Sequence, residues 1–103
     1  MPAKPAPFTL FFERLFLESY SELGLKEKKA VDRSVQLLAN NPRHPSLQVH
    51  KAKSIQAKYP AGGTGVYIAY VTKGLRITFE YGPEPGSISL RNCGFHDVSE
   101  RKI

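Results

Sequence analysis

The sequence predicts an α+β fold in which two N-terminal helices pack on a small antiparallel sheet. Apolar residues recur at helical spacing as far as residue 40 and alternate with polar residues from residue 75 onward. Prolines and glycines separate these halves from each other and punctuate the second half. The 103 residues have the length of one domain. We therefore expect a flexible N-terminal arm at residues 1–7 and a single domain over residues 8–103.

The helical half begins where the proline-containing arm ends. Residues 8–12 are aromatic and β-prone, which predicts a strand, and the apolar residues that follow are spaced as in a helix. A second helix is predicted over residues 26–40 from the helical spacing of its apolar residues. It should end there, because Pro42 disfavours helical backbone in the residue before it. The apolar positions are Phe16, Tyr20 and Leu23 in the first helix and Val31, Val35 and Leu38 in the second.

The second half predicts three consecutive antiparallel strands. Residues 66–71 are rich in β-branched and aromatic side chains, and residues 75–81 alternate strictly between apolar and polar. Residues 87–91 alternate in the same way, after a glycine- and proline-rich turn at residues 82–86. A meander of this kind has one face for the helices and leaves the other face for a ligand.

Composition excludes several classes of protein. The chain is 41% hydrophobic and 23% charged, which is typical of a globular domain. The apolar stretch at residues 8–17 contains Glu13 and Arg14 and is too short to span a membrane. A lone Cys93 and the lack of a secretory signal favour the cytoplasm. No spacing of His, Cys or acidic residues matches a metal site, so we expect neither metal nor cofactor.

The net charge of +6 leaves two interpretations open. Residues 1–42 carry six Lys or Arg against five acids, whereas residues 43–103 carry nine against four. Such an excess favours a polyanionic partner, although charge on a small protein also serves solubility alone.

The candidate chemical residues lie in this basic half. Arg76 and Arg91 occupy polar positions of the predicted strands, and residues 50–53 (His50-Lys51-Ala52-Lys53) add three potentially cationic side chains. His96 follows the last strand. Metal-free RNA cleavage needs a base, an acid and cations that hold the developing phosphate charge, which His, Lys and Arg supply. The alternative is that these are ordinary surface residues, with the arginines discouraging edge pairing.

Four segments, at residues 41–47, 50–53, 75–80 and 90–97, resemble in their order and spacing the RelE/ParE superfamily of type II toxin–antitoxin toxins. The likeness is to the branch termed cytotoxic translational repressors and covers residues 8–98. It implies two helices against a small antiparallel sheet and neutralisation by a cognate antitoxin. It also implies, as in the nuclease members, metal-independent cleavage of mRNA on the ribosome.

The resemblance assigns roles residue by residue. Arg76 matches the arginine that stabilises the transition-state phosphate, and His96 matches the late histidine that acts as general acid. His50 falls where some members carry an active-site histidine, and Lys51 and Lys53 fall in the strand that holds RNA or supplies the base. Arg91 is predicted to bind RNA from the same face as Arg76. Leu75 and Ser54 stand where tyrosine and glycine are usual, and the general base stays open.

Two further functions are compatible with this resemblance. Other members of the superfamily poison DNA gyrase by binding it, without being enzymes. The second further function is that of a catalytically silent binding domain. His96 favours the nuclease, because the gyrase-poisoning branch generally has no histidine acid at this place.

Overall fold

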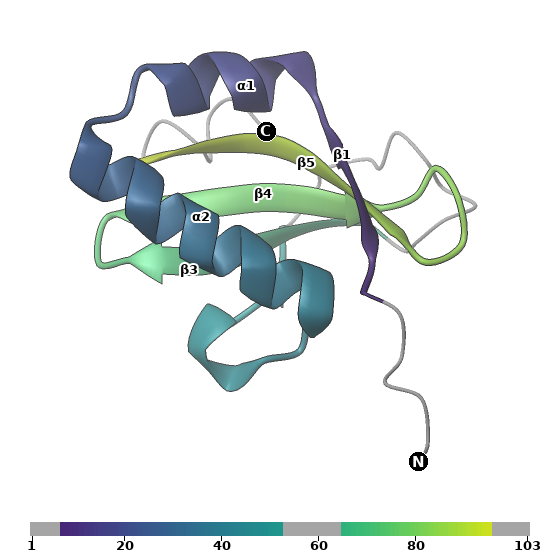
Figure 1. Ribbon diagram of the computed structural model, residues 1–103. Coiled ribbons are helices and arrows are strands. Elements are labelled where there is room, and N and C mark those ends of the chain that lie inside the picture. Colours follow the sequence, from purple (N-terminus) through teal and green to yellow (C-terminus); the bar gives the residue numbers. More distant parts are fainter. Residues whose placement is uncertain (1–6, 53–64, 96–103) are drawn as a thin grey trace.

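Two helices lie on one face of a five-stranded sheet (Figure 1). The computed structural model describes residues 7–52 and 65–95. The elements in chain order are β1 (Thr9–Phe12), α1 (Arg14–Ser21), α2 (Leu25–Asn40), a 3₁₀ turn η1 (Pro45–Leu47), β2 (His50–Lys51), β3 (Val66–Thr72), β4 (Leu75–Tyr81) and β5 (Ser87–Phe95). The α+β class is therefore confirmed, with boundaries close to those predicted. Residues 1–6 of the expected flexible arm lie outside the described residues.

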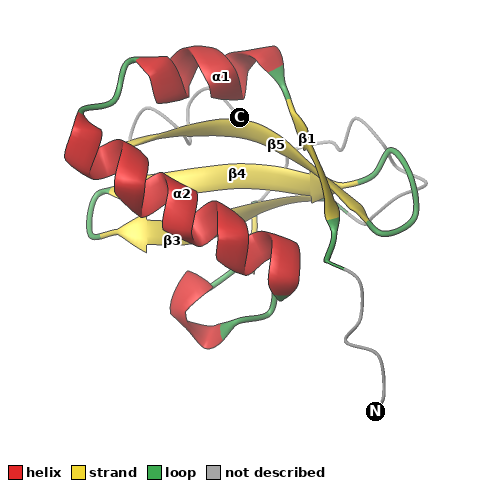
Figure 2. Ribbon diagram, in the orientation of Figure 1, coloured by secondary structure: helices red, strands yellow, loops and turns green. Residues whose placement is uncertain are grey.

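The strand order is β1-β5-β4-β3-β2. The strands β3, β4 and β5 form the predicted antiparallel meander through short turns (Figure 2). At the other edge β1 pairs in parallel with β5, from Thr9 opposite Ser87 to Phe12 opposite Leu90. The sheet is thus mixed, where the sequence predicted an antiparallel one. The alternation pattern describes each strand separately and contains no information about a partner far away in the chain.

The core fills the space between the sheet and the helices. The predicted stripe of α2 is correct, since Val31 and Leu38 are fully buried, and Ser34 completes the buried side of the helix. Alternate residues of β4 and β5 meet this stripe, because successive side chains of a strand point to opposite faces. The sheet contributes Ala69, Leu75, Ile77, Phe79, Ile88, Leu90 and Cys93 to this cluster.

The first helix packs beside β5, the strand that β1 joins (Figure 1). Its Phe16 is buried, and the Ser19 hydroxyl lies 2.6 Å from Oδ1 of the buried Asn92. The Cys93 thiol faces the Phe16 carbonyl oxygen at 3.9 Å. The first half of β5 therefore pairs with β1, whereas the second half contacts α1. Neither described helix has the length and apolarity needed to cross a membrane.

The sheet face opposite the helices is only partly open. Thr78 and Glu80 in the middle of β4 are almost completely buried, although alternation places them away from the main core. A second, smaller apolar cluster of Ala52, Val66 and Ile68 lies on this face. The expectation that this face would be left for a ligand is therefore wrong for its centre. Val66 and Ile68 of β3 lie opposite Glu80 and Thr78, and Arg91 pairs with Glu80. The alternation of a single strand does not reveal these neighbours.

Candidate nucleic-acid interface

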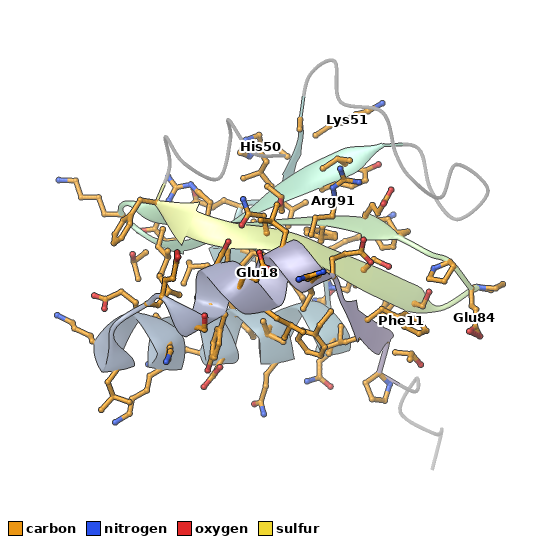
Figure 3. The ribbon with its side chains drawn as sticks, turned by 90° about the horizontal axis from the view of Figure 1, so that it is seen from above. Phe11, Glu18, His50, Lys51, Glu84 and Arg91 are labelled. Atoms are coloured by element: carbon orange, nitrogen blue, oxygen red, sulfur yellow. The ribbon has the colours of Figure 1, made fainter. Side chains whose placement is uncertain are left out.

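Strand pairing arranges the candidate residues in rows on the face opposite the helices. Residues opposite each other on antiparallel strands place their side chains on the same face. One row runs from β2 to β5 through His50, Ile68, Thr78 and Asn92. The next row toward the β3–β4 turn contains Tyr70, Arg76 and Gly94. Figure 3 shows His50 and Arg91 on the side of the sheet away from the helices.

Arg76 lies at the end of this face beside the β3–β4 turn. Its Nη1 donates to the Thr72 carbonyl oxygen at 2.6 Å and to the Leu75 carbonyl oxygen at 3.0 Å. The guanidinium carbon lies 4.8 Å from the centre of the Tyr70 ring, which is within the range of a cation–π contact. These contacts orient a half-exposed guanidinium on the predicted face. They also use one of its nitrogens, so a phosphate would meet the remaining N–H groups.

Arg91 reaches Glu80 on the neighbouring strand, and Nη1 and Oε1 lie 2.9 Å apart. The Glu80 side chain is 1% exposed and the Arg91 side chain 19%. Arg91 stands at a break in the β4–β5 pairing, since Thr78 lies opposite Asn92 and the next residue, Phe79, lies opposite Leu90. The extra residue is a β-bulge, which re-aims side chains in a strand. Arg91 thus lies on the face predicted for it, with Glu80 compensating its charge.

His50 and Lys51 form the short edge strand β2, and both are exposed (Figure 3). Nδ1 of His50 lies 3.3 Å from the carbonyl oxygen of Gln48. The Lys51 stem crosses Gly65, where a Cβ would stand 2.6 Å from Lys51 Cε, so glycine permits this approach. From strand spacing and rise, the Cα atoms of His50 and Arg76 are about 12 Å apart, a distance that two long side chains and one phosphate group can bridge.

Two predicted site residues, Lys53 and His96, lie outside the described residues. The chain position that leads to His96 is nevertheless described, because Phe95 is the last residue of β5 and lies opposite Leu75. Leu75 directly precedes Arg76. The strand therefore ends beside the residue that the resemblance assigns to the phosphate.

The sequence did not indicate Tyr70 or Glu80 as partners of the two arginines. Both relationships require the strand register, which pairs Tyr70 with Arg76 and sets Glu80 within reach of the bulge at Arg91. Glu80 in the alternating stretch of β4 could have indicated its ion pair, because a buried carboxylate needs a cation as partner. Among the described residues, no three His, Cys, Asp or Glu side chains gather where they could hold a metal ion.

Several solved structures resemble this arrangement. No family model matches the sequence, and no curated protein matches it significantly. The archaeal RelE–RelB complex from Pyrococcus horikoshii has a chain that aligns with a TM-score of 0.66 at 11% identity, over 86% of this chain and 94% of that one. YafQ from Escherichia coli aligns with a TM-score of 0.65 at 14% identity, over 89% and 97% of the two chains.

YoeB from Staphylococcus aureus, solved as a dimer, aligns with a TM-score of 0.60 at 18% identity, over 88% of this chain and 99% of that one. The alignments cover most of this chain and nearly the whole length of the other chains. The likeness agrees with the four sequence segments that resemble the superfamily. The chain has the fold of the RelE/ParE superfamily of toxins.

Proposed function

We propose that this protein is the toxin of a type II toxin–antitoxin system and acts in the cytoplasm as a metal-independent, ribosome-dependent mRNA endoribonuclease. One observation carries the proposal. Arg76 lies on the sheet face opposite the helices, beside the end of β5, and His96 is the next residue of the chain after that end. A cation and a titratable imidazole near one another are what metal-free RNA cleavage requires.

In this reaction each residue has a distinct task. Arg76 binds the phosphate under attack and stabilises the charge that builds on its oxygens. His96 donates a proton to the departing 5′-oxygen, while His50, Lys51 or Lys53 takes the proton from the attacking 2′-hydroxyl. Lys51 and Lys53 also hold the RNA backbone. Arg91 is proposed to contact the RNA as well, beside its ion pair with Glu80.

The proposed partner in the cell is a cognate antitoxin. The structurally similar RelE–RelB and DinJ–YafQ proteins were solved as toxin–antitoxin complexes. A chain with a net charge of +6 favours an acidic or amphipathic segment that wraps around it. Co-purification with a small protein encoded beside it would support this partner, and normal growth during overexpression of the chain alone would argue against it.

The proposed reaction is tested by inducing the chain alone and mapping the 5′ ends of cellular transcripts. The nuclease predicts new 5′ ends within translated messages, in register with codons. Gyrase-dependent DNA breaks without such ends would identify a gyrase poison instead. The absence of both would leave a silent binding domain, so each outcome selects one function.

A further inference from the structure

A cavity of about 500 Å³ lies on the other side of the sheet, at the end of α2. Its walls come from the loop between α2 and β2 and from two tyrosines of the sheet. Size places it within the range of small-ligand sites, which run from roughly 300 to 1,000 Å³. Its lining includes Pro42, Arg43, His44, Pro45, Tyr67 and Tyr81.

The side chains that line this cavity supply several hydrogen-bond donors. His44 accepts on Nδ1 from the backbone N–H of Ser46, at 3.2 Å, so the neutral ring carries its proton on Nε2. Arg43 is exposed and contributes a guanidinium that is always charged. Burial and the neighbouring Tyr67 raise the pKa of Tyr81, so its hydroxyl stays protonated at neutral pH. No Asp or Glu is among the described residues that line the cavity.

The apolar walls have a different character. Two prolines flank Arg43 and His44 on the loop, and the rings of Tyr67 and Tyr81 meet edge to face with centroids 5.6 Å apart. The loop also holds Gln48 in the left-handed backbone conformation, with φ 45°. Such a conformation is costly for a residue other than glycine and is often kept at a binding site. The cavity therefore combines anion-binding donors with walls suited to a flat apolar group.

The stretch of sequence that forms most of this cavity carries no acidic residue. Residues 33–79 contain no Asp or Glu at all, while they include Arg43, Lys51 and Arg76. The cavity and the candidate interface lie on opposite faces of the sheet and meet at the same strand, β3. Tyr67 faces the cavity, and Ile68, the next residue of β3, shares a row with His50 on the other face. A chain of anionic groups that crosses the edge strand β2 would meet both sites.

We propose that this cavity binds one unpaired nucleotide of an RNA strand, with its phosphate at Arg43 and His44 and its base against the tyrosines and prolines. An acidic peptide side chain would satisfy Arg43, but it would leave most of a 500 Å³ cavity with ring and proline walls unfilled. Unpaired bases are commonly recognised by aromatic side chains and arginine. That the nucleotide belongs to RNA rests on the proposed function. That the cavity fits a nucleotide rests only on its lining residues.

The test is titration of the ¹⁵N-labelled full chain with adenosine 5′-monophosphate, adenosine, inorganic phosphate and a glutamate-rich peptide, followed by NMR. The nucleotide should shift the amide signals of residues 42–49, 67 and 81 and bind more tightly than adenosine or phosphate alone. Arg43→Ala should weaken nucleotide binding at least about tenfold, since a charge-assisted phosphate contact is lost. Arg33→Ala removes an exposed cation of α2 and should leave the affinity unchanged.

Three outcomes would overturn the proposal. One is nucleotide affinity that Arg43→Ala leaves intact, and another is phosphate binding as tight as nucleotide binding. The third is a response of these signals to the peptide but not to the nucleotide, which would assign the cavity to a protein partner. Because the titration needs no cleavage, its result is independent of whether the chain proves to be a nuclease.

Discussion

The carboxylate of Glu80 and the guanidinium of Arg91 form an ion pair between adjacent strands, 2.9 Å apart and enclosed on the sheet face opposite the helices. Glu80→Ala would leave the mostly buried arginine without this compensation, which costs roughly 3 kcal/mol of unfolding free energy. Denaturant unfolding measures this loss. Glu84→Ala is the matched control, because Glu84 is an exposed residue of the β4–β5 turn (Figure 3) and its change should stay within about 0.5 kcal/mol.

A double-mutant cycle separates this pair from its surroundings. If the two side chains stabilise each other, Glu80→Ala, Arg91→Ala and the double variant should show a coupling of about 1 to 3 kcal/mol. Additive effects would mean that the contact between Glu80 and Arg91 adds nothing to stability.

Arg76→Ala tests the phosphate contact. We expect cleavage on programmed ribosomes to fall at least about a hundredfold, because a preorganised donor to the transition state is removed. Stability should fall by only about 1 kcal/mol, since the lost hydrogen bonds go to exposed turn carbonyls. Lys73→Ala removes an exposed cation from the same turn and should leave cleavage within about threefold. A folded Arg76→Ala protein with full activity would remove Arg76 from the mechanism.

His96→Gln tests the general acid. Loss of a positioned acid slows a reaction by about 10²–10⁴-fold, whereas loss of a surface histidine changes stability by about 0.5 kcal/mol or less. We therefore expect cleavage to drop at least about a hundredfold with thermal stability and antitoxin binding intact. Single-turnover rates within about threefold of the parent would contradict the role.

The hydroxyl of Ser19 holds α1 against β5 through the buried Asn92. Ser19→Ala leaves a buried amide oxygen without this donor, so we expect a loss of about 1–2 kcal/mol of unfolding free energy. Ser21→Ala is the control on the same helix, because the Ser21 hydroxyl contacts only the exposed helix turn through the Glu18 carbonyl oxygen. Equal losses of unfolding free energy in the two variants would mean that the hydrogen bond from Ser19 to Asn92 adds no stability of its own.

Burial raises the pKa of the Cys93 thiol to about 12. The native protein should therefore resist a thiol reagent at pH 8 and react on unfolding. Because the folded state holds the proton more tightly, unfolding free energy is unaffected below about pH 9 and decreases as the pH rises toward about 12. In Cys93→Ala the part of this decrease in unfolding free energy that comes from the thiol should be absent. Rapid labelling of the folded protein at pH 8 would show that the thiol is accessible.

The parts of the fold that follow from local pattern were predicted well. The stripe of Val31 and Leu38 and the alternation through Phe79 each describe one element, and both lie in the core as expected. The parallel pairing of Thr9 with Ser87 and the bulge at Arg91 were not predictable, because they depend on which strands become neighbours. For the same reason the sequence showed Arg76 as a candidate but not the Tyr70 ring beneath it.

The parallel pair of β1 and β5 has a consequence for how the molecule is made. The first described strand hydrogen-bonds with the last described one, so closing this contact requires a long loop between Phe12 and Ser87. Contacts of such sequence separation slow folding. A nascent chain that ends before Ser87 has no strand to receive β1 and no β5 edge for α1 to cover. During synthesis the described fold therefore remains incomplete until β5 has emerged, because only this strand joins β1 and α1 to the meander.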